Sequence, residues 1–261
     1  MIAQRVTPRV QQWLRNSGSA RVLHLFKEVC TLANERDEVI SLVSPAVGLG
    51  PFTAVLSGGF TSGLDVRQLV TLDGARQTLT VGTLIVDAGD SAIWQPKPNW
   101  SRLQSADIAK WPPVPALPSN IAGSLKLTIK GILANDPVTC MAGVESLAGR
   151  GRGLTPTGDD VLVGILYGLW VWYPHYLPRP REEWMEMIVK AAVPRTTTLS
   201  ANFIQAACDG EAIWQWHDLV NGCPYSIERI LSIGHTSGAD ALAGLMYIGF
   251  ILRSTLGNGE S

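Results

Sequence analysis

The chain has 261 residues, 46% of them hydrophobic, and a formal net charge of −1. A chain of this length and composition can bury a sizeable core, in one large domain or two small ones. The balanced charge argues against nucleic acid as a partner, because nucleic-acid-binding proteins usually present a dominant basic surface. The uncharged run 161–173 is shorter than the roughly 20 apolar residues that cross a membrane, so it predicts a buried helix.

The cysteines and the N-terminal segment indicate the compartment. The four cysteines are widely spaced and form no Cys-x-x-Cys motif, which is typical of reduced thiols and argues against zinc: Cys30, Cys140, Cys208 and Cys223. Residues 1–15 lack the apolar core of a secretory signal. We therefore expect a soluble cytoplasmic protein that does not associate with membranes.

Residues 1–94 carry the patterns of a β-rich half. A short helix is predicted at 10–14. Runs rich in β-branched residues predict strands at 22–26, 38–43, 69–72 and 78–86. Asp73-Gly74 lies between the last two runs and is a typical hairpin sequence. This half is expected to form a small antiparallel sheet or barrel.

Six prolines and three tryptophans follow between Trp94 and Pro118. The proline density excludes regular strands and helices, and the tryptophans indicate a strap packed across a surface. We place the domain boundary at the end of this strap. Residues 1–118 are predicted to form a β-rich domain that includes the strap, and residues 119–261 a helical domain.

After Ser119 the hydrophobic pattern becomes helical, and the predicted helices are joined by short connections. Helices are expected at 119–134, 136–148, 158–173, 181–192, 199–209, 211–221, 224–232 and 238–253. The predicted fold class is therefore α+β, with a small antiparallel β half followed by a compact, mainly helical half.

An internal repeat organises the helical half. Residues 157–167 read Thr-Gly-Asp-Asp-Val-Leu-Val-Gly-Ile-Leu-Tyr, and residues 237–247 read Ser-Gly-Ala-Asp-Ala-Leu-Ala-Gly-Leu-Met-Tyr. Both follow the pattern Ser/Thr-Gly-x-Asp-x-Leu-x-Gly-x-x-Tyr. We predict two loop-to-helix units of one design, whose helices begin side by side and whose loops face a common site.

Helix capping is a structural explanation of this repeat. Thr157 with Asp160, and Ser237 with Asp240, fit the capping box, in which a hydroxyl and an acid three residues later satisfy backbone amides. Glycines inside the two helices permit a close crossing. Capping and packing together explain the shared pattern without a ligand.

Further polar residues before the two helices favour a binding site. Helix N-termini combine amides, hydroxyls and a positive dipole end, which suits small anions. A third hydroxyl-rich turn, 195–200, leads into another predicted helix. The predicted anion-binding residues are Arg150, Arg152, Thr155, Thr157, Gly158, Arg195, Thr197, Thr236, Ser237 and Gly238.

Two residues are predicted to act in chemistry. Asp160 is assigned to its cap, whereas Asp159 aligns with Ala239 in the repeat, so the fold does not require an acid there. Asp159 is therefore the candidate acid. His235, in the second loop, is a candidate for proton transfer or for donating a hydrogen bond to an oxyanion.

Magnesium is an alternative ligand of the same region. Asp159, Asp160 and Asp240 supply carboxylates, and Mg²⁺ favours a few carboxylates with water. No Walker-type phosphate loop occurs in the sequence. No cofactor is assigned beyond this alternative.

The two loops resemble a known family. The segments 153–160 (Gly-Leu-Thr-Pro-Thr-Gly-Asp-Asp) and 234–240 (Gly-His-Thr-Ser-Gly-Ala-Asp) are similar to those of the AllH family. Members of that family form one subunit of the oxamate carbamoyltransferase complex, which acts in the anaerobic breakdown of allantoin. The Gly-x-Gly-Pro turn at 48–51 is also similar. The carbamoyltransferase signature Ser-x-Arg-Thr-Arg is absent from the chain.

The resemblance implies a cytoplasmic subunit that works with two different partner proteins. The complex interconverts oxalurate plus phosphate with oxamate plus carbamoyl phosphate. These substrates are small anions, in agreement with the anion site inferred from the residues. Transfer of a carbamoyl group develops charge on a tetrahedral oxygen, which helix-end amides and hydroxyls stabilise.

Two other functions fit parts of the sequence. One is a non-enzymatic subunit that binds a metabolite or acts as a scaffold, with the β half as its docking region. The other is a Mg²⁺-dependent hydrolase with a helical carboxylate site, loosely similar to ADP-ribosylglycohydrolases. The hydrolase requires several convergent acids, whereas the repeat supplies mainly hydroxyls and amides.

Overall fold

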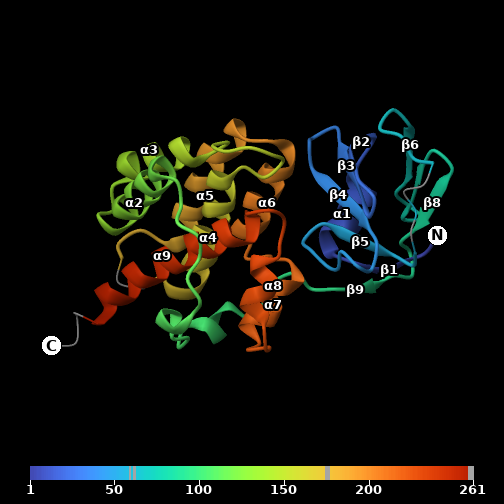
Figure 1. The fold of residues 1–261 in the computed structure, drawn as a ribbon. Helices are drawn as coiled ribbons and strands as arrows, with labels where there is room; N and C mark the ends of the chain where they lie inside the picture. Colours follow the sequence, from blue (N-terminus) through green and yellow to red (C-terminus); the bar gives the residue numbers. More distant parts are fainter. Residues whose placement is uncertain (59, 61–62, 174–176, 258–261) are drawn as a thin grey trace. The chain divides into compact units, whose positions relative to one another are not determined.

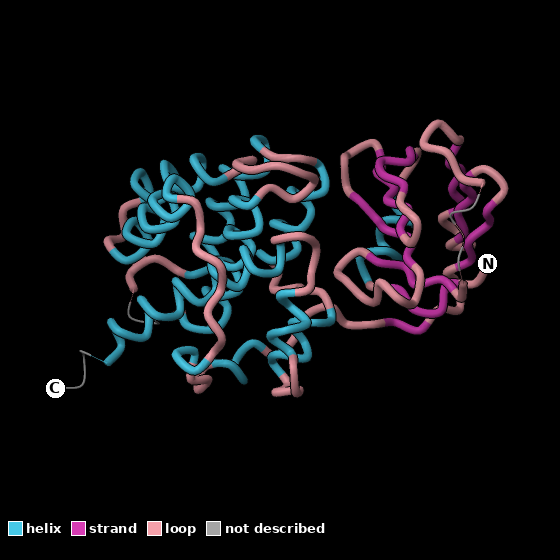
Figure 2. The backbone as a smooth tube through the Cα atoms, viewed as in Figure 1, coloured by secondary structure: helices cyan, strands magenta, loops and turns pink. Residues whose placement is uncertain are grey.

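The computed structural model describes residues 1–58, 60, 63–173 and 177–257. The chain divides into two compact units: Met1–Pro96 with Ala212–Trp214 form the first, and Lys97–Glu211 with the chain from Gln215 onward form the second. Strands build the first unit, and nearly all helices lie in the second (Figure 2). The predicted α+β fold class is confirmed.

The described residues of the first unit form one sheet of nine strands, in the order β8-β7-β6-β2-β3-β4-β5-β1-β9. Figure 1 labels these strands except β7. Most neighbours are antiparallel, but β4 pairs with β5, and β1 with β9, in parallel. The sheet is therefore mixed. The loop 44–52 connects β4 to β5 and carries the chain back, so that β5 begins at the same end of the sheet as β4. The strands are β1 (Ala3–Val6), β2 (Ala20–Leu25), β3 (Val29–Asn34), β4 (Val39–Val43), β5 (Thr53–Leu56), β6 (Leu69–Asp73), β7 (Thr78–Val81), β8 (Leu84–Asp87) and β9 (Ala92–Ile93).

The hairpin predicted at Asp73-Gly74 is present, with Asp73 opposite Thr78. The run predicted as a single strand at 78–86 is instead two antiparallel strands, β7 and β8. The chain reverses at Gly82, whose φ of +56° favours glycine.

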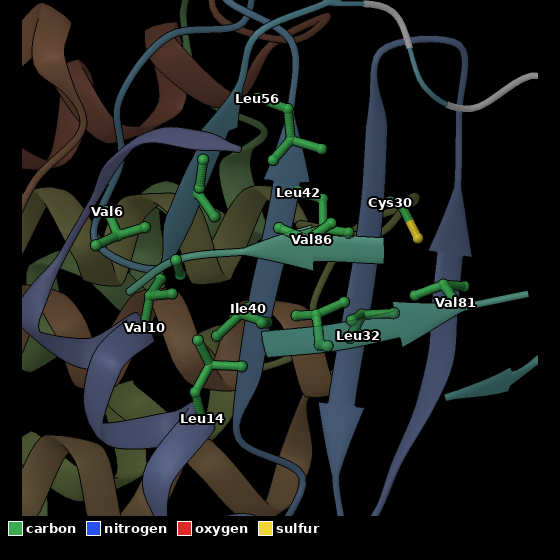
Figure 3. Packing of buried hydrophobic residues seen from close by; sticks show 14 of the residues in the cluster. Val6, Val10, Leu14, Cys30, Leu32, Ile40, Leu42, Leu56, Val81 and Val86 are labelled. Atoms are coloured by element: carbon green, nitrogen blue, oxygen red, sulfur yellow. The ribbon is translucent and has the colours of Figure 1, made fainter. Parts of the chain in front are cut away.

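The core of the first unit lies between the sheet and helix α1 (Pro8–Asn16). The Thr7 hydroxyl caps α1 by accepting a hydrogen bond from the Val10 amide, at 3.3 Å. Figure 3 shows side chains from the helix and the strands in this core: Val6, Val10, Leu14, Cys30, Leu32, Ile40, Leu42, Leu56, Val81 and Val86.

The proline-rich strap contains two short 3₁₀ helices, η1 (Trp100–Leu103) and η2 (Ile108–Lys110). Within the second unit, the ring of Trp100 stacks on Tyr167 with 4.6 Å between centroids. Its indole nitrogen donates a hydrogen bond to the Gly210 carbonyl, at 2.8 Å. Trp100 thus fixes the strap to the helices by both packing and hydrogen bonding.

The second unit is a helical array, and its helices agree with the predicted ones apart from their ends. The largest difference is at 211–213, where the Ala212 amide bonds to the Pro96 carbonyl instead of starting a helix. The helices are α2 (Ser119–Leu133), α3 (Pro137–Leu147), α4 (Thr157–Trp172), α5 (Arg181–Ala192), α6 (Thr198–Cys208), α7 (Trp214–Val220), α8 (Ser226–Leu231) and α9 (Ser237–Gly257). In the described part of the chain, none is long and apolar enough to cross a membrane.

The two repeat helices, α4 and α9, pack against each other (Figure 1). A Cβ atom on Gly164 would lie 1.9 Å from the Ala241 carbonyl oxygen, and one on Gly244 would lie 2.3 Å from that of Val161. Val161 and Ala241 occupy the same position of the repeat, so each helix meets the other through equivalent residues. The crossing is pseudo-symmetric, and the prediction that the two helices begin side by side is confirmed.

Candidate functional site

The start of α4 is not capped as the sequence suggested. Pro156 occupies the N-cap position, without a side-chain cap, and Thr157 is the first helical residue. The Gly158 amide donates to the Arg150 carbonyl at 2.8 Å, and the Asp160 amide donates to the Pro156 carbonyl. The capping-box interpretation of Thr157 is therefore wrong, because main-chain carbonyls satisfy these amides.

The start of α9 has the same arrangement. The Gly238 amide donates to the Ile233 carbonyl at 3.1 Å, and the Asp240 amide donates to the Thr236 carbonyl at 2.8 Å. These amides are not available to an anion, in contrast to the expectation of unsatisfied amides at both helix starts. These four amides therefore contribute no hydrogen bond to a ligand at the two helix starts.

Asp159 has structural contacts that its alignment with Ala239 did not reveal. Its side chain is buried, and it accepts hydrogen bonds from the Gly149 amide, at 2.7 Å, and from the Thr196 hydroxyl. Burial raises the pKa of this carboxyl, while the bonds from Thr196, Gly149 and Ser200 oppose that effect. Asp159 therefore anchors the preceding loop and the 195–200 turn to α4.

Loop 149–158, which we call the arginine loop, is held at further points. The Thr197 hydroxyl donates to the Leu154 carbonyl at 2.6 Å and accepts from the Ser200 amide as the N-cap of α6. Gly149 adopts a φ of +69°, and a Cβ there would lie 2.3 Å from the Arg195 carbonyl oxygen. The predicted third turn thus packs directly on the first loop.

The three predicted arginines have different surroundings. Arg150 and Arg152 are exposed, and neither guanidinium has a hydrogen bond or an ion pair among the residues that the structure describes. Arg195 instead pairs with Glu145, at 3.0 Å, and donates to the Ala191 carbonyl. Arg150 and Arg152 are thus available for a ligand, whereas Arg195 already has partners.

The loops of the two repeat units meet through hydroxyl groups. The Thr155 and Ser237 oxygens lie 2.8 Å apart in a hydrogen bond. Both hydroxyls lie close enough to the carboxyl of Asp160 to oppose the rise in its pKa that burial causes. Burial also raises the pKa of the Asp240 carboxyl, and the nearby hydroxyls of Thr236 and Thr157 oppose that rise. Each repeat helix therefore places its acid against the hydroxyl that begins the other helix.

The carboxyl groups of Asp160 and Asp240 do not have hydrogen-bond partners for all their oxygen atoms. The Oδ2 atoms of Asp160 and Asp240 are both buried without a hydrogen-bond partner among the described residues. Burial, together with repulsion from Asp240 and Asp159, raises the pKa of Asp160 to about 8, although the Ser237 and Thr155 hydroxyls oppose the shift. Asp160 therefore retains its proton near neutral pH, unlike an ordinary carboxyl.

His235 lies on the exposed second loop and has no hydrogen bond to the residues that the structure describes. It follows Gly234, whose φ is +59°. His235 and Thr236 directly precede Ser237, the first residue of α9. No hydrogen bond to a described residue orients the His235 side chain. Its role in proton transfer stays a prediction.

The structure offers limited support for magnesium. No group of three or more Cys, His, Asp or Glu side chains suited to a metal occurs in the described ranges. Asp159 contacts Gly149 and Thr196, whereas Asp160 and Asp240 contact the hydroxyls of the two helix starts. The three carboxylates thus do not share one set of neighbours.

Comparison with known proteins agrees with the resemblance seen in the two loops. Residues 147–249 match the sequence model of the family described as oxamate carbamoyltransferase subunit AllH. The matched region contains the arginine loop, the 195–200 turn, the second loop and both helix starts. No solved structure matches the chain.

Proposed function

We propose that this chain is a subunit of an oxamate carbamoyltransferase complex and that its arginine loop binds the anionic part of a substrate. The family match covers all the loops that would form the site. Phosphate, carbamoyl phosphate, oxamate and oxalurate are the substrates that the resemblance implies. In this proposal, other subunits of the complex are the chain's protein partners.

One observation carries the proposal: Arg150 and Arg152 are exposed, have no partner among the described residues, and belong to a loop whose backbone is fixed. Asp159 and Thr197 hold that backbone through the hydrogen bonds described above. Guanidinium groups bind phosphate and carboxylate through paired hydrogen bonds. Because the loop is already ordered, less conformational entropy is lost when the ligand binds.

The hydroxyl groups beside the arginines complete the proposed site. Thr155, Thr157, Ser237 and Thr236 lie at the two helix starts, where the positive dipole ends favour developing negative charge. His235 is the proposed exposed group for proton exchange with solvent. The hydroxyls would stabilise the tetrahedral oxygen that forms during carbamoyl transfer.

Isothermal titration calorimetry with phosphate tests the proposal. Arg150→Ala and Arg152→Ala should each weaken binding by about tenfold or more, since a charged hydrogen bond contributes about 1.5–3 kcal/mol. Arg76→Ala is the matched control, because Arg76 is an exposed arginine of the other unit that pairs with Asp73. Unchanged phosphate affinity in both loop variants would contradict the proposal.

A subunit that binds a metabolite without catalysis is the second candidate. It shares the arginine loop but predicts that the assembled complex turns over normally when this loop is weakened. Measuring carbamoyl phosphate formation by the complex with Arg152→Ala separates the two functions. A weakened affinity with unchanged turnover at saturating phosphate would favour the binding subunit.

A further inference from the structure

We propose that the two arginines of the arginine loop have different roles: Arg150 binds an anion from a fixed backbone, whereas Arg152 moves on the glycines beside it and closes only onto a phosphoryl group. This inference rests on the proposed function and adds to it the residue that distinguishes phosphoryl from carboxylate ligands. Its structural half, the difference in backbone freedom between the two arginines, can be tested without any ligand.

The main chain at Arg150 is fixed on both sides. Its amide donates a hydrogen bond to the Leu147 carbonyl at 2.9 Å, and its carbonyl accepts one from the Gly158 amide at 2.8 Å. The preceding Gly149 amide donates to Asp159. Leu147 is the last residue of α3, and Gly158 belongs to the first turn of α4. The backbone of Arg150 is therefore tied to two helices.

The loop is fixed again at Leu154. The carbonyl of this residue accepts hydrogen bonds from the Thr197 hydroxyl, at 2.6 Å, and from the Ser200 hydroxyl, at 3.3 Å. Ser200 is buried, so this anchor belongs to the interior of the helical unit. The next residue, Thr155, bonds to Ser237 as described above. Only a short stretch of the loop therefore lies between its two anchors.

That stretch is Gly151-Arg152-Gly153, and the hydrogen bonds that fix the loop act before and after it. All three residues are exposed, and none of their amides or carbonyls forms a hydrogen bond to a residue that the structure describes. Exposed backbone without such bonds rearranges at little cost in free energy. Arg152 is therefore carried by backbone that can move, whereas Arg150 is not.

The two glycines of this stretch differ in their surroundings. Gly151 has a φ of +134°, and a Cβ there would lie 2.6 Å from the Thr157 amide nitrogen, so a side chain does not fit beside the start of α4. Gly153 has a φ of +92°, but apart from its chain neighbours nothing would lie within 4 Å of an added Cβ. Close approach explains Gly151 and does not explain Gly153. A glycine at 153 supplies backbone freedom directly after Arg152.

The oxygen atoms of a ligand determine whether it engages both arginines. One guanidinium spans the two oxygens of a carboxylate through paired hydrogen bonds, so Arg150 alone can occupy that group. A phosphoryl group offers a further oxygen and more negative charge, which remain available to Arg152. Closing the loop costs the conformational entropy of the free stretch, and these additional charged hydrogen bonds offset that cost. Arg152 therefore closes onto phosphate and stays open over a simple carboxylate.

Backbone ¹⁵N relaxation of the free protein tests the difference in mobility. Order parameters should be about 0.85 at Arg150 and Leu154, as in rigid backbone, and below about 0.6 at Arg152 and Gly153. Saturating phosphate should raise the values at Arg152 and Gly153, whereas saturating oxamate should leave them unchanged. Uniform order parameters across the loop of the free protein would overturn the proposal, whatever the chain binds.

Calorimetry with phosphate and with oxamate tests the selection. Arg152→Ala should weaken phosphate binding by about tenfold or more, the loss expected for a charged hydrogen bond, and should leave oxamate binding unchanged. Arg150→Ala should weaken the binding of both ligands. Equal losses for the two ligands in Arg152→Ala would overturn the selection. Unchanged phosphate affinity in both variants would instead contradict the proposed function, while the relaxation result would remain valid.

Gly153→Ala tests the moving stretch without removing a guanidinium. Alanine adopts positive φ poorly, so the substitution should draw the loop away from its observed path. We expect phosphate affinity to fall toward that of Arg152→Ala, with oxamate affinity unchanged. Gly222→Ala, after α7, is the matched control: Gly222 has a φ of +69° and equally open space around an added Cβ, so this variant should bind both ligands like the parent. If both glycine variants bind phosphate like the parent, the role of Gly153 is overturned.

Discussion

Two adjacent aspartates at the start of α4 show how far neighbouring residues can differ in role. Asp159 bonds to the Gly149 amide and to the Thr196 hydroxyl, whereas Asp160 contacts the other repeat unit through Ser237. An alignment of the repeat makes Asp159 dispensable, because the second unit has alanine there. The hydrogen bonds of Asp159 indicate instead that the arginine loop depends on it.

Asp159→Ala is therefore expected to destabilise the protein by about 1–3 kcal/mol, because the partly buried Gly149 amide and the Thr196 hydroxyl lose their partner. For a chain of this size, such a loss lowers the melting temperature by several degrees. Thermal unfolding followed by circular dichroism measures it, with the exposed Asp90→Ala as the control. Equal melting temperatures for Asp159→Ala and the parent would show that the anchor is unimportant.

The raised pKa of Asp160 also predicts how stability changes with pH. The folded state binds this proton up to about pH 8, whereas an unperturbed aspartate releases it near 3.8. The free energy of unfolding should therefore fall as the pH rises between these values. Burial shifts Asp159 and Asp240 in the same direction. Urea denaturation should show this decline, with a shallower slope for Asp160→Asn and an unchanged slope for Asp90→Asn.

At the scale of elements, the crossing of α4 and α9 places the two loops side by side. Gly164→Ala should separate these helices, since its Cβ would lie 1.9 Å from the Ala241 carbonyl oxygen. We expect a loss of about 1–3 kcal/mol, typical of overpacking. Gly123→Ala in α2 is the control: apart from its own helix backbone and chain neighbours, nothing would lie within 4 Å of the added Cβ, so the substitution should stabilise the helix by about 0.5–1 kcal/mol. Similar unfolding midpoints for the two variants would argue against a tight crossing.

At the scale of the whole molecule, the two units are not consecutive in the chain. Ala212–Trp214 belong to the first unit although their neighbours in sequence belong to the second. The Trp214 amide donates to the Leu49 carbonyl at 3.0 Å, and its indole would collide with a Cβ on Gly48. The Gly-x-Gly-Pro turn at 48–51 is therefore completed by a residue far along the chain.

Trp214→Ala is expected to loosen this turn, because the turn loses its packing partner. Hydrogen exchange should become faster at the amides of residues 47–53, while exchange in the rest of the sheet changes little. Trp111→Ala, in the second unit, should leave the exchange of 47–53 unchanged. An equal response to both substitutions would mean that Trp214 does not support the turn.

The sequence by itself determined most of the helices, the strand-rich first half and the repeat. Their signals are local: hydrophobic periodicity, proline density and a pattern of glycines that recurs after 80 residues. It also predicted that the two loops lie together, because helices with similar starts that pack through glycines bring the preceding loops side by side. The parallel strand pairs were missed, since the direction of β5 depends on the path of loop 44–52.

Only the tertiary structure decided that Asp159 anchors the arginine loop, whereas Asp160 has a carboxyl oxygen without a hydrogen-bond partner among the described residues. The partner of Asp159 is Thr196, 37 residues further along the chain, and that of Asp160 is Ser237 on the other repeat unit. Likewise, Glu145 on α3 pairs with Arg195, while Arg150 and Arg152 stay exposed. Local sequence encodes where a helix begins, but hydrogen-bond partners and burial depend on which distant segments the fold brings together.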